Sequence, residues 1–211
     1  MFVWNDHKEY EGKHALFSAS GHHWLNYDDE TFINRYYSQF ASQIGTSIHE
    51  LAHECITGRI KLNKHDVHLV EMKLYKAYVP REMYDANVIL DNLIPFVNDA
   101  IGFRMYSEKI VFVNPYFFGT ADAIRYDDKE SVLRIFDLKT GSAPVKMDQL
   151  YIYAAEFCIE YNVDPRKIKK IETRIYQLGE VIIDNPTGAQ IYEIVQLIKD
   201  RTELIMRLLG R

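Results

Sequence analysis

The most constraining feature of the sequence is the segment Val132–Lys139, which reads VLRIFDLK and carries apolar residues on both of its faces. A strand of that kind lies in the centre of a sheet and is covered on both sides. Asp137 lies inside it, and a lone carboxylate in such a place needs a partner. Because side chains alternate along a strand, Asp137 and Lys139 point to the same side. The segment therefore predicts a buried strand with a charged site near its end.

A second acidic residue, Asp122, lies in the segment Thr120–Tyr126, which we expect to form a neighbouring strand. The residues between the two strands, Asp127–Glu130, are typical of a turn. Pairing of Asp122 with Ile135 would place both carboxylates and the lysine on one face of the hairpin. A register that differs by one residue would send Asp122 to the opposite face, so the expected cluster depends on the turn.

Two carboxylates in a partly buried site repel each other unless a positive charge lies between them. A hard divalent cation bound through carboxylate oxygens relieves that repulsion, and magnesium suits such ligands. The hairpin therefore predicts a magnesium site at Asp122 and Asp137. The alternative is a surface hairpin with solvated charges, which the apolar residues on both faces around Asp137 disfavour.

Several short motifs occur in one order along most of the chain, from residue 18 to residue 153. They are Ser18-Ala-Ser20, Gly45-Thr-x-x-His49-Glu50, Gly119-Thr-Ala-Asp122, Asp137-Leu-Lys139-Thr-Gly141 and Gln149-x-x-x-Tyr153. In these residues the sequence resembles the PD-(D/E)XK nuclease superfamily, in its RecB-like and phage exonuclease branch. Many members of that branch hold an iron–sulfur cluster on four cysteines. This chain has only two cysteines, so we expect no iron–sulfur cluster.

The resemblance implies an α/β fold with a central mixed β-sheet flanked by helices, as in restriction endonucleases, and an N-terminal helical part. The order of the expected helices and strands points to the same architecture. The implied activity is that of a magnesium-dependent deoxyribonuclease, an exonuclease of phage-type DNA recombination, replication or repair. DNA is the implied partner, and a second copy of the chain or a recombination protein is a further candidate. The expected location is the cytoplasm of a bacterial or phage-infected cell, which suits two free thiols.

The resemblance also implies which residues form the site. The first metal ion would be held by His49, Asp122, Asp137 and the carbonyl of Leu138, and a second magnesium ion would share Asp122. Manganese would be able to replace magnesium. Lys139 would orient the attacking water or neutralise charge that develops on the phosphate.

Further candidate contacts with DNA come from the helix after the hairpin and from basic residues. Gln149 and Tyr153 are four residues apart and share one helix face, from which they would reach the lysine or a phosphate. The net charge of −5 argues against a large basic surface, although bound metal ions and a local patch can hold nucleic acid. The remaining candidate contacts are Ser18, Ser20, Arg166, Lys167, Lys169 and Lys170.

The segment His49-Glu50-Leu51-Ala52-His53 also fits the zinc protease signature H-E-x-x-H, because its two histidines lie one helical turn apart. No third ligand follows at a recognisable spacing, and the metzincin form needs a glycine where this chain has Ile56. A zinc metalloprotease is one alternative function, and His53 is otherwise an ordinary residue of the helix surface. A catalytically silent subunit that binds DNA ends is the second alternative.

The length and the 47% hydrophobic content suit one domain over residues 1–211, mainly helical over 1–100 and with the sheet in 101–211. No apolar run reaches the roughly 20 residues of a membrane helix.

We interpret Glu108, in an expected strand over 103–113, as a solvated side chain, with an outer acid of the metal site as the alternative. The other expected elements are helices over Asp29–Gln43, from Thr46 or Ser47 after a break at Gly45, over 64–78, from Pro80 to about Asp99, over Pro144–Asn162 and over Thr187–Leu209, and a hairpin of Glu172–Leu178 with Val181–Asp184.

Overall fold

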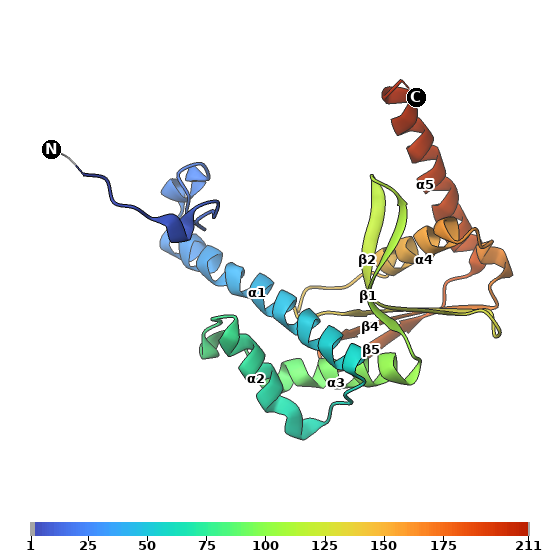
Figure 1. The fold of residues 1–211 in the computed structure, drawn as a ribbon, viewed down its shortest axis with the longest axis horizontal. Coiled ribbons are helices and arrows are strands. Elements are labelled where there is room, and N and C mark those ends of the chain that lie inside the picture. Colours follow the sequence, from blue (N-terminus) through green and yellow to red (C-terminus); the bar gives the residue numbers. More distant parts are fainter. Residues whose placement is uncertain (1–2, 211) are drawn as a thin grey trace.

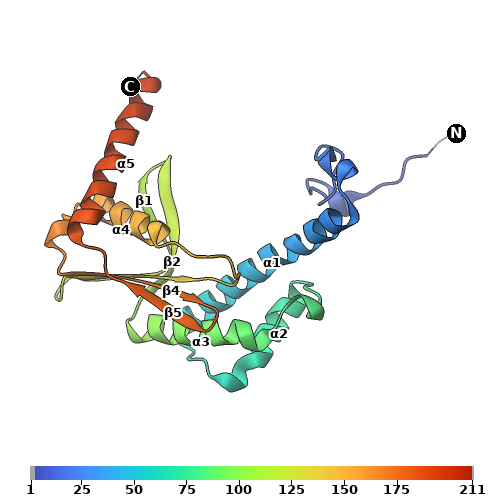
Figure 2. The ribbon, with the colours of Figure 1, turned by 180° about the vertical axis from the view of Figure 1, so that it is seen from behind.

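The computed structural model of the protein describes residues 3–210, and Figures 1 and 2 show the chain from opposite sides. Helices make up most of the first hundred residues, and the sheet follows. The helices are α1 (Asp29–Gly58), α2 (Val67–Lys76), α3 (Ala86–Gly102), α4 (Asp148–Glu160) and α5 (Gly188–Leu208). The strands are β1 (Tyr106–Asn114), β2 (Phe117–Asp127), β3 (Val132–Leu138), β4 (Lys170–Gln177) and β5 (Glu180–Asp184).

The strands form one mixed sheet in the order β1-β2-β3-β4-β5. β3 and β4 are parallel, and the other neighbouring pairs are antiparallel. A mixed sheet flanked by helices confirms the expected α/β class. β3 is the buried central strand that its apolar faces predict. No helix within residues 3–210 is long and apolar enough to cross a membrane.

Each face of the sheet is covered by its own group of helices. Phe136 and Leu138 of β3 pack with α1, α2 and α3 in one core cluster. Leu133 and Ile135 point to the other face, where they pack with α4 and α5. The two cysteines are free and buried, one in each cluster. Both faces of β3 are therefore sealed from water along most of its length.

The hairpin of β2 and β3 forms as predicted, but its register differs by two residues. Ile135 lies opposite Ile124 rather than opposite Asp122. Asp127 already pairs with the first residue of β3, so the turn starts one residue later than expected. A shift of two residues preserves the alternation of faces, and Asp122 therefore still shares a face with Asp137.

Two predicted helix boundaries in the N-terminal half are wrong. α1 runs through Gly45 without a break, because its buried apolar stripe continues on both sides of the glycine. That burial outweighs the roughly 1 kcal/mol that a glycine costs inside a helix. Pro80 begins only a short 3-10 turn, and α3 starts at Ala86. The carboxylate of Asp85 accepts hydrogen bonds from two backbone N–H groups there and caps the helix.

A third predicted boundary, the start of a helix at Pro144, is also wrong, because α4 begins at Asp148. The preceding loop is held in an irregular conformation by the side chain of Gln177 on β4. Its amide Nε2 donates to the carbonyl of Gly141 at 2.6 Å and to that of Ala143 at 2.9 Å. The loop thus leads from the end of β3 to α4 with two of its backbone carbonyls bonded by one side chain.

The C-terminal elements agree with the sequence prediction. β4 and β5 form an antiparallel hairpin over nearly the predicted residues. Thr187 caps α5 through its hydroxyl, which accepts a hydrogen bond from the N–H of Gln190 at 3.2 Å. The Gln190 side chain accepts in return from the N–H of Thr187 at 2.8 Å. This reciprocal capping box explains why a local motif located the start of the helix correctly.

Candidate metal centre

The end of β3 brings the two predicted carboxylates and the lysine together. Asp137 is only 2% exposed. Lys139 Nζ donates to its Oδ1 at 3.1 Å and lies 2.9 Å from its Oδ2. Asp122 on β2 accepts a hydrogen bond from the backbone N–H of Leu138, with Oδ2 at 2.8 Å. That bond fixes the Asp122 carboxylate beside the end of β3, on the side that the alternation of the strands predicts.

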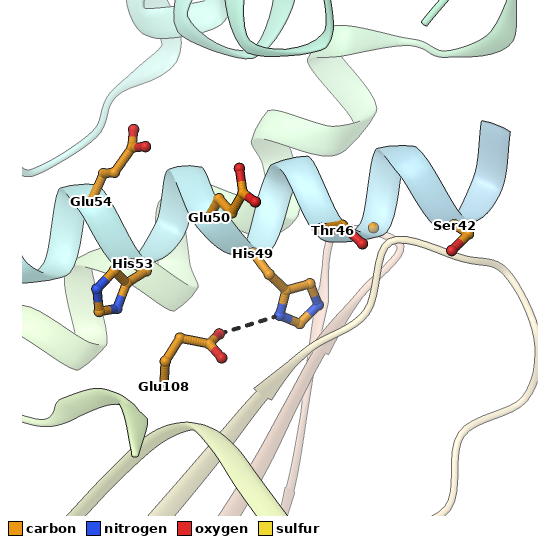
Figure 3. Close-up of a pocket in the computed structure, with 8 residues that line it drawn as sticks. Ser42, Thr46, His49, Glu50, His53, Glu54 and Glu108 are labelled. Atoms are coloured by element: carbon orange, nitrogen blue, oxygen red, sulfur yellow. Dashed lines mark ion pairs between the residues drawn. The ribbon is translucent and has the colours of Figure 1, made fainter. Parts of the chain in front are cut away.

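His49 of α1 joins this cluster from the other side of the groove between helix and hairpin. Its Nδ1 lies 3.4 Å from Asp122 Oδ1 and 3.9 Å from Glu108 Oε1 on β1. Figure 3 shows the imidazole pointing from α1 toward Glu108. One ligand atom from each of these three residues lies within 4.8 Å of the others, an arrangement that could hold a metal ion.

Glu108 is exposed, as the sequence favours, but it also belongs to the group that could hold a metal, which was the alternative interpretation. Its φ of 51° lies in the left-handed region, which a residue other than glycine rarely adopts. Across the hairpin, Ala123 packs in the cluster of α1–α3, whereas Ala121 packs in the cluster of α4. Residues two apart normally share a face, so the hairpin twists sharply between them. Glu108 lies at this twist, partly exposed but facing His49 and Asp122.

The cluster carries more negative charge than its burial favours. Burial and the neighbouring Asp122 raise the pKa of Asp137 to about 6, although Lys139 opposes that shift. Burial and Asp122 also raise the pKa of Glu108. For His49, burial alone would lower the pKa, but the facing carboxylates outweigh burial and raise it. Each shift has the direction expected for acids crowded together without enough positive charge.

The donor set fits a divalent cation. Asp137 Oδ2 is buried and accepts no hydrogen bond from residues 3–210, since the nearby lysine is not aligned with it. Its partner in the structure is the ion pair with Lys139, and a bound cation would relieve the repulsion between the acids. A set of carboxylates with a single imidazole offers mostly oxygen atoms as ligands. Such a set favours magnesium or manganese.

A chain of hydrogen bonds holds Lys139 in place. Its Nζ donates to Gln149 Oε1 at 3.0 Å, and Gln149 Nε2 donates to Tyr153 Oη at 2.9 Å. Tyr153 in turn lies against Gly119 of β2, where an added Cβ would be 2.6 Å from the ring. Gly119 is therefore needed for α4 to approach the strand this closely. The structure thus brings Gln149 and Tyr153 to the site, one turn apart on α4 as their spacing predicts.

The H-E-x-x-H motif is not arranged as a zinc protease site. His53 lines the same pocket as His49, a space of about 640 Å³ beside the cluster. Glu50, which would be the general base, points away from the histidines (Figure 3). It pairs with Lys73 of α2, Nζ to Oε2 at 3.2 Å. Within residues 3–210, the group that could hold a metal consists of His49, Glu108 and Asp122, and it includes neither His53 nor the predicted ligand Asp137.

The predicted serine contacts lie far from the cluster. Ser18 and Ser20 bond each other, with their Oγ atoms 3.1 Å apart, in the segment before α1. The first residue of α1 is Asp29, about 30 Å along the helix axis from His49. Ser18 also accepts a hydrogen bond from the N–H of Gly21 at 3.0 Å. The structure therefore gives these serines a local role in the turn rather than a place at the metal centre.

The basic run of residues 166–170 is also remote from the cluster. Lys170 pairs with Val132 at the start of β3, and Asp137 lies five residues further along, about 17 Å away. Two of the cations are already paired, Arg166 with Asp164 at 2.9 Å and Lys170 with a β4 glutamate at 2.7 Å. Lys167 and Lys169 lie between them. These residues would contact nucleic acid only well away from the metal centre.

The fold and the site define an α/β protein with a candidate divalent-cation centre at the end of its central strand. The chain belongs to the family described as "Protein of unknown function (DUF2800)", whose model matches residues 14–178. That range includes every residue of the candidate centre. No curated protein and no solved structure matches the chain.

Proposed function

We propose that the protein is a magnesium-dependent deoxyribonuclease that hydrolyses phosphodiester bonds in DNA. The observation that carries the proposal is the meeting of His49, Glu108 and Asp122 next to the Asp137–Lys139 pair. Acids that could bind metal, with an amine beside them, are the groups that phosphodiester hydrolysis requires. The motif resemblance extends the proposal to an exonuclease with the restriction-endonuclease-like core, acting in phage-type DNA recombination, replication or repair.

The candidate ligands that lie together are His49, Glu108 and Asp122. The motif resemblance adds Asp137 and the carbonyl of Leu138. These five ligands, of which Asp122 would be shared, would allow two magnesium ions, with manganese as substitute. Bound magnesium would supply Lewis-acid chemistry, activating water and stabilising charge on the phosphate.

The other residues of the site would position the lysine and the substrate. Lys139 Nζ lies 2.9 Å from Asp137 Oδ2, and an amine at this place is suited to neutralise charge that develops on a phosphate. Gln149 accepts a hydrogen bond from the lysine and donates one to Tyr153, so neither side chain is free to rotate. This arrangement places the ammonium beside the acids before any substrate binds, which is how an active site avoids reorganising during the reaction.

Digestion of end-labelled linear DNA, compared with covalently closed circular DNA, tests the proposal. We expect the purified protein to degrade linear DNA with magnesium or manganese and to be inactive in EDTA. Resistance of the closed circle would identify an exonuclease, and its cleavage an endonuclease. If folded protein cleaves neither DNA with either metal, the proposed function is wrong.

A further inference from the structure

The outer half of the β1–β2 hairpin presents an apolar face that no helix within residues 3–210 covers. Val111 and Ala121 point toward α4 and are buried there. The alternate residues Phe112 and Phe118 lie opposite each other and are 45% and 56% exposed. Their ring centroids are 6.1 Å apart, and Ile110 beside them is also exposed. Two large rings thus lie in water on a strand that leads directly to the metal centre.

This aromatic face is held rigidly. The backbone N–H of Phe112 donates to Glu160 Oε2 of α4 at 2.9 Å. Near the tip of the hairpin, Asn114 Nδ2 donates to Thr202 Oγ1 of α5 at 3.0 Å. In Figures 1 and 2, α4 and α1 lie on opposite sides of this hairpin, so the face that α4 leaves uncovered is open toward the groove. A fixed ring loses little conformational freedom when something stacks on it.

The α1 side of the groove carries a row of polar side chains. Ser42, Thr46, His49 and His53 are spaced four, three and four residues apart, so they share one helix face, and all four line the pocket beside Glu108. Figure 3 shows them on the side of α1 opposite to Glu50 and Glu54, two acids that line the same pocket. Hydroxyl and ring N–H groups of this kind bond phosphate oxygens.

We propose that the groove binds single-stranded DNA, with phosphates along the polar row of α1 and bases on Phe112 and Phe118. The inference rests on the proposed function, because it places the scissile phosphate at the metal centre. Phe118 and Asp122 are four residues apart on β2, about 13 Å along the strand. That distance spans about four nucleotides at a stacked spacing of about 3.4 Å.

The polar row of α1 and the aromatic face of the hairpin together favour an unpaired DNA strand over a duplex. In a duplex the faces of the bases are covered by their neighbours, so an exposed ring pair has nothing to stack on. An unpaired strand offers both base faces and a flexible backbone, and stacking of bases on aromatic rings is tolerant of sequence. Phe112 and Phe118 lie on the same hairpin as the acids of the candidate metal centre. One DNA strand would therefore contact both the rings and the metal centre.

Binding measured in calcium, without cleavage, tests the proposal. The probes are a fluorescein-labelled single strand of 20 nucleotides, the same strand built from abasic nucleotides, and a blunt duplex of the same sequence. We expect the single strand to bind at least tenfold more tightly than either of the others. Removing a stacking ring costs about five- to a hundredfold in affinity, so the Phe112→Ala/Phe118→Ala protein should lose at least tenfold for the single strand. Tyr75→Ala, which removes an exposed ring from α2, should bind as the parent does.

A Phe112→Leu/Phe118→Leu protein guards against loss of the fold, because it keeps apolar side chains on the hairpin while removing the rings. Equal binding of normal and abasic strands, or unchanged binding by both double variants, would overturn the proposal even if the parent cleaves DNA. A parent dimer that the variants convert to monomers would show that the face joins two copies of the chain, which also overturns it. Ring-dependent binding without any DNA cleavage would support this inference while refuting the proposed function.

Discussion

Glu156 of α4 allows the packing of this helix against the sheet to be tested through pH. Its side chain is only 3% exposed, and its Oε2 has no hydrogen-bond partner among residues 3–210. An added Cβ at Gly119 would be 3.6 Å from that oxygen, so the carboxyl group lies close to β2. Burial, and then the charge of Glu160, raise the pKa of Glu156 to about 7.

The raised pKa has a defined effect on stability. Between pH 4.5 and about 7 the unfolded chain has released the Glu156 proton while the folded chain retains it. The free energy of unfolding therefore falls as pH rises through this window and levels off above it. At about 1.4 kcal/mol for each tenfold change in proton affinity, the loss amounts to about 3 kcal/mol. Glu156→Gln keeps the size of the side chain and removes the titration.

Urea unfolding of the parent and of Glu156→Gln at pH 5 and pH 8 measures the contribution of Glu156 to the free energy of unfolding. Other groups titrate in the same range, so the informative quantity is the difference between the two proteins. We expect Glu156→Gln to gain about 2.5 kcal/mol relative to the parent between the two pH values. Glu193→Gln, at an exposed position on α5, controls for the loss of a charge. Parallel pH dependence of the parent and Glu156→Gln would show that the buried position assigned to this carboxyl is wrong.

The remaining predictions concern the metal centre. Asp122→Asn and Asp137→Asn should each lower magnesium-dependent DNA cleavage about a thousandfold or more, because metal binding supplies several kcal/mol at about 1.4 kcal/mol per tenfold. Near-normal rates in either folded variant would refute these ligands. Lys139→Ala should cost about a hundred- to a thousandfold in rate but keep magnesium binding in calorimetry. If Lys139→Ala lost both cleavage and magnesium binding, the role assigned to the lysine would be wrong, because it would be needed for the metal to bind. His49→Ala should reduce cleavage sharply and His53→Ala only a few fold. One tightly bound zinc per chain, lost in both histidine variants, would favour the protease instead.

Much of the sheet could be predicted because its signals are local. β3 is apolar on both faces, and burial on both sides follows from that pattern alone. The placement of Asp137 and Lys139 on one side follows from the two-residue period of a strand. That period also explains why Asp122 was predicted on the correct face although its predicted pairing partner was wrong. The error in the register was two residues and not one.

The wrong boundaries have one physical cause, which is that distant contacts outweighed local preferences. Gly45 lies inside α1 because residues on both sides of it bury apolar side chains. Pro144 does not start α4 because Gln177, on a strand far along the chain, bonds the carbonyls of the loop. Glycine and proline set local preferences of a few kcal/mol at most, and tertiary burial and hydrogen bonding override them.

By itself, the sequence determined the class of fold, the central strand and the set of Asp122, Asp137 and Lys139, because strand periodicity and burial act between near neighbours. Only the tertiary structure decided that Glu108 belongs with His49. Its place depends on a left-handed backbone conformation that interrupts the alternation of the hairpin, and on the packing of α1 beside it. The alternation rule cannot show where a strand departs from alternation. Glu108 could therefore be assigned to the site only from the positions of α1 and the hairpin in the structure.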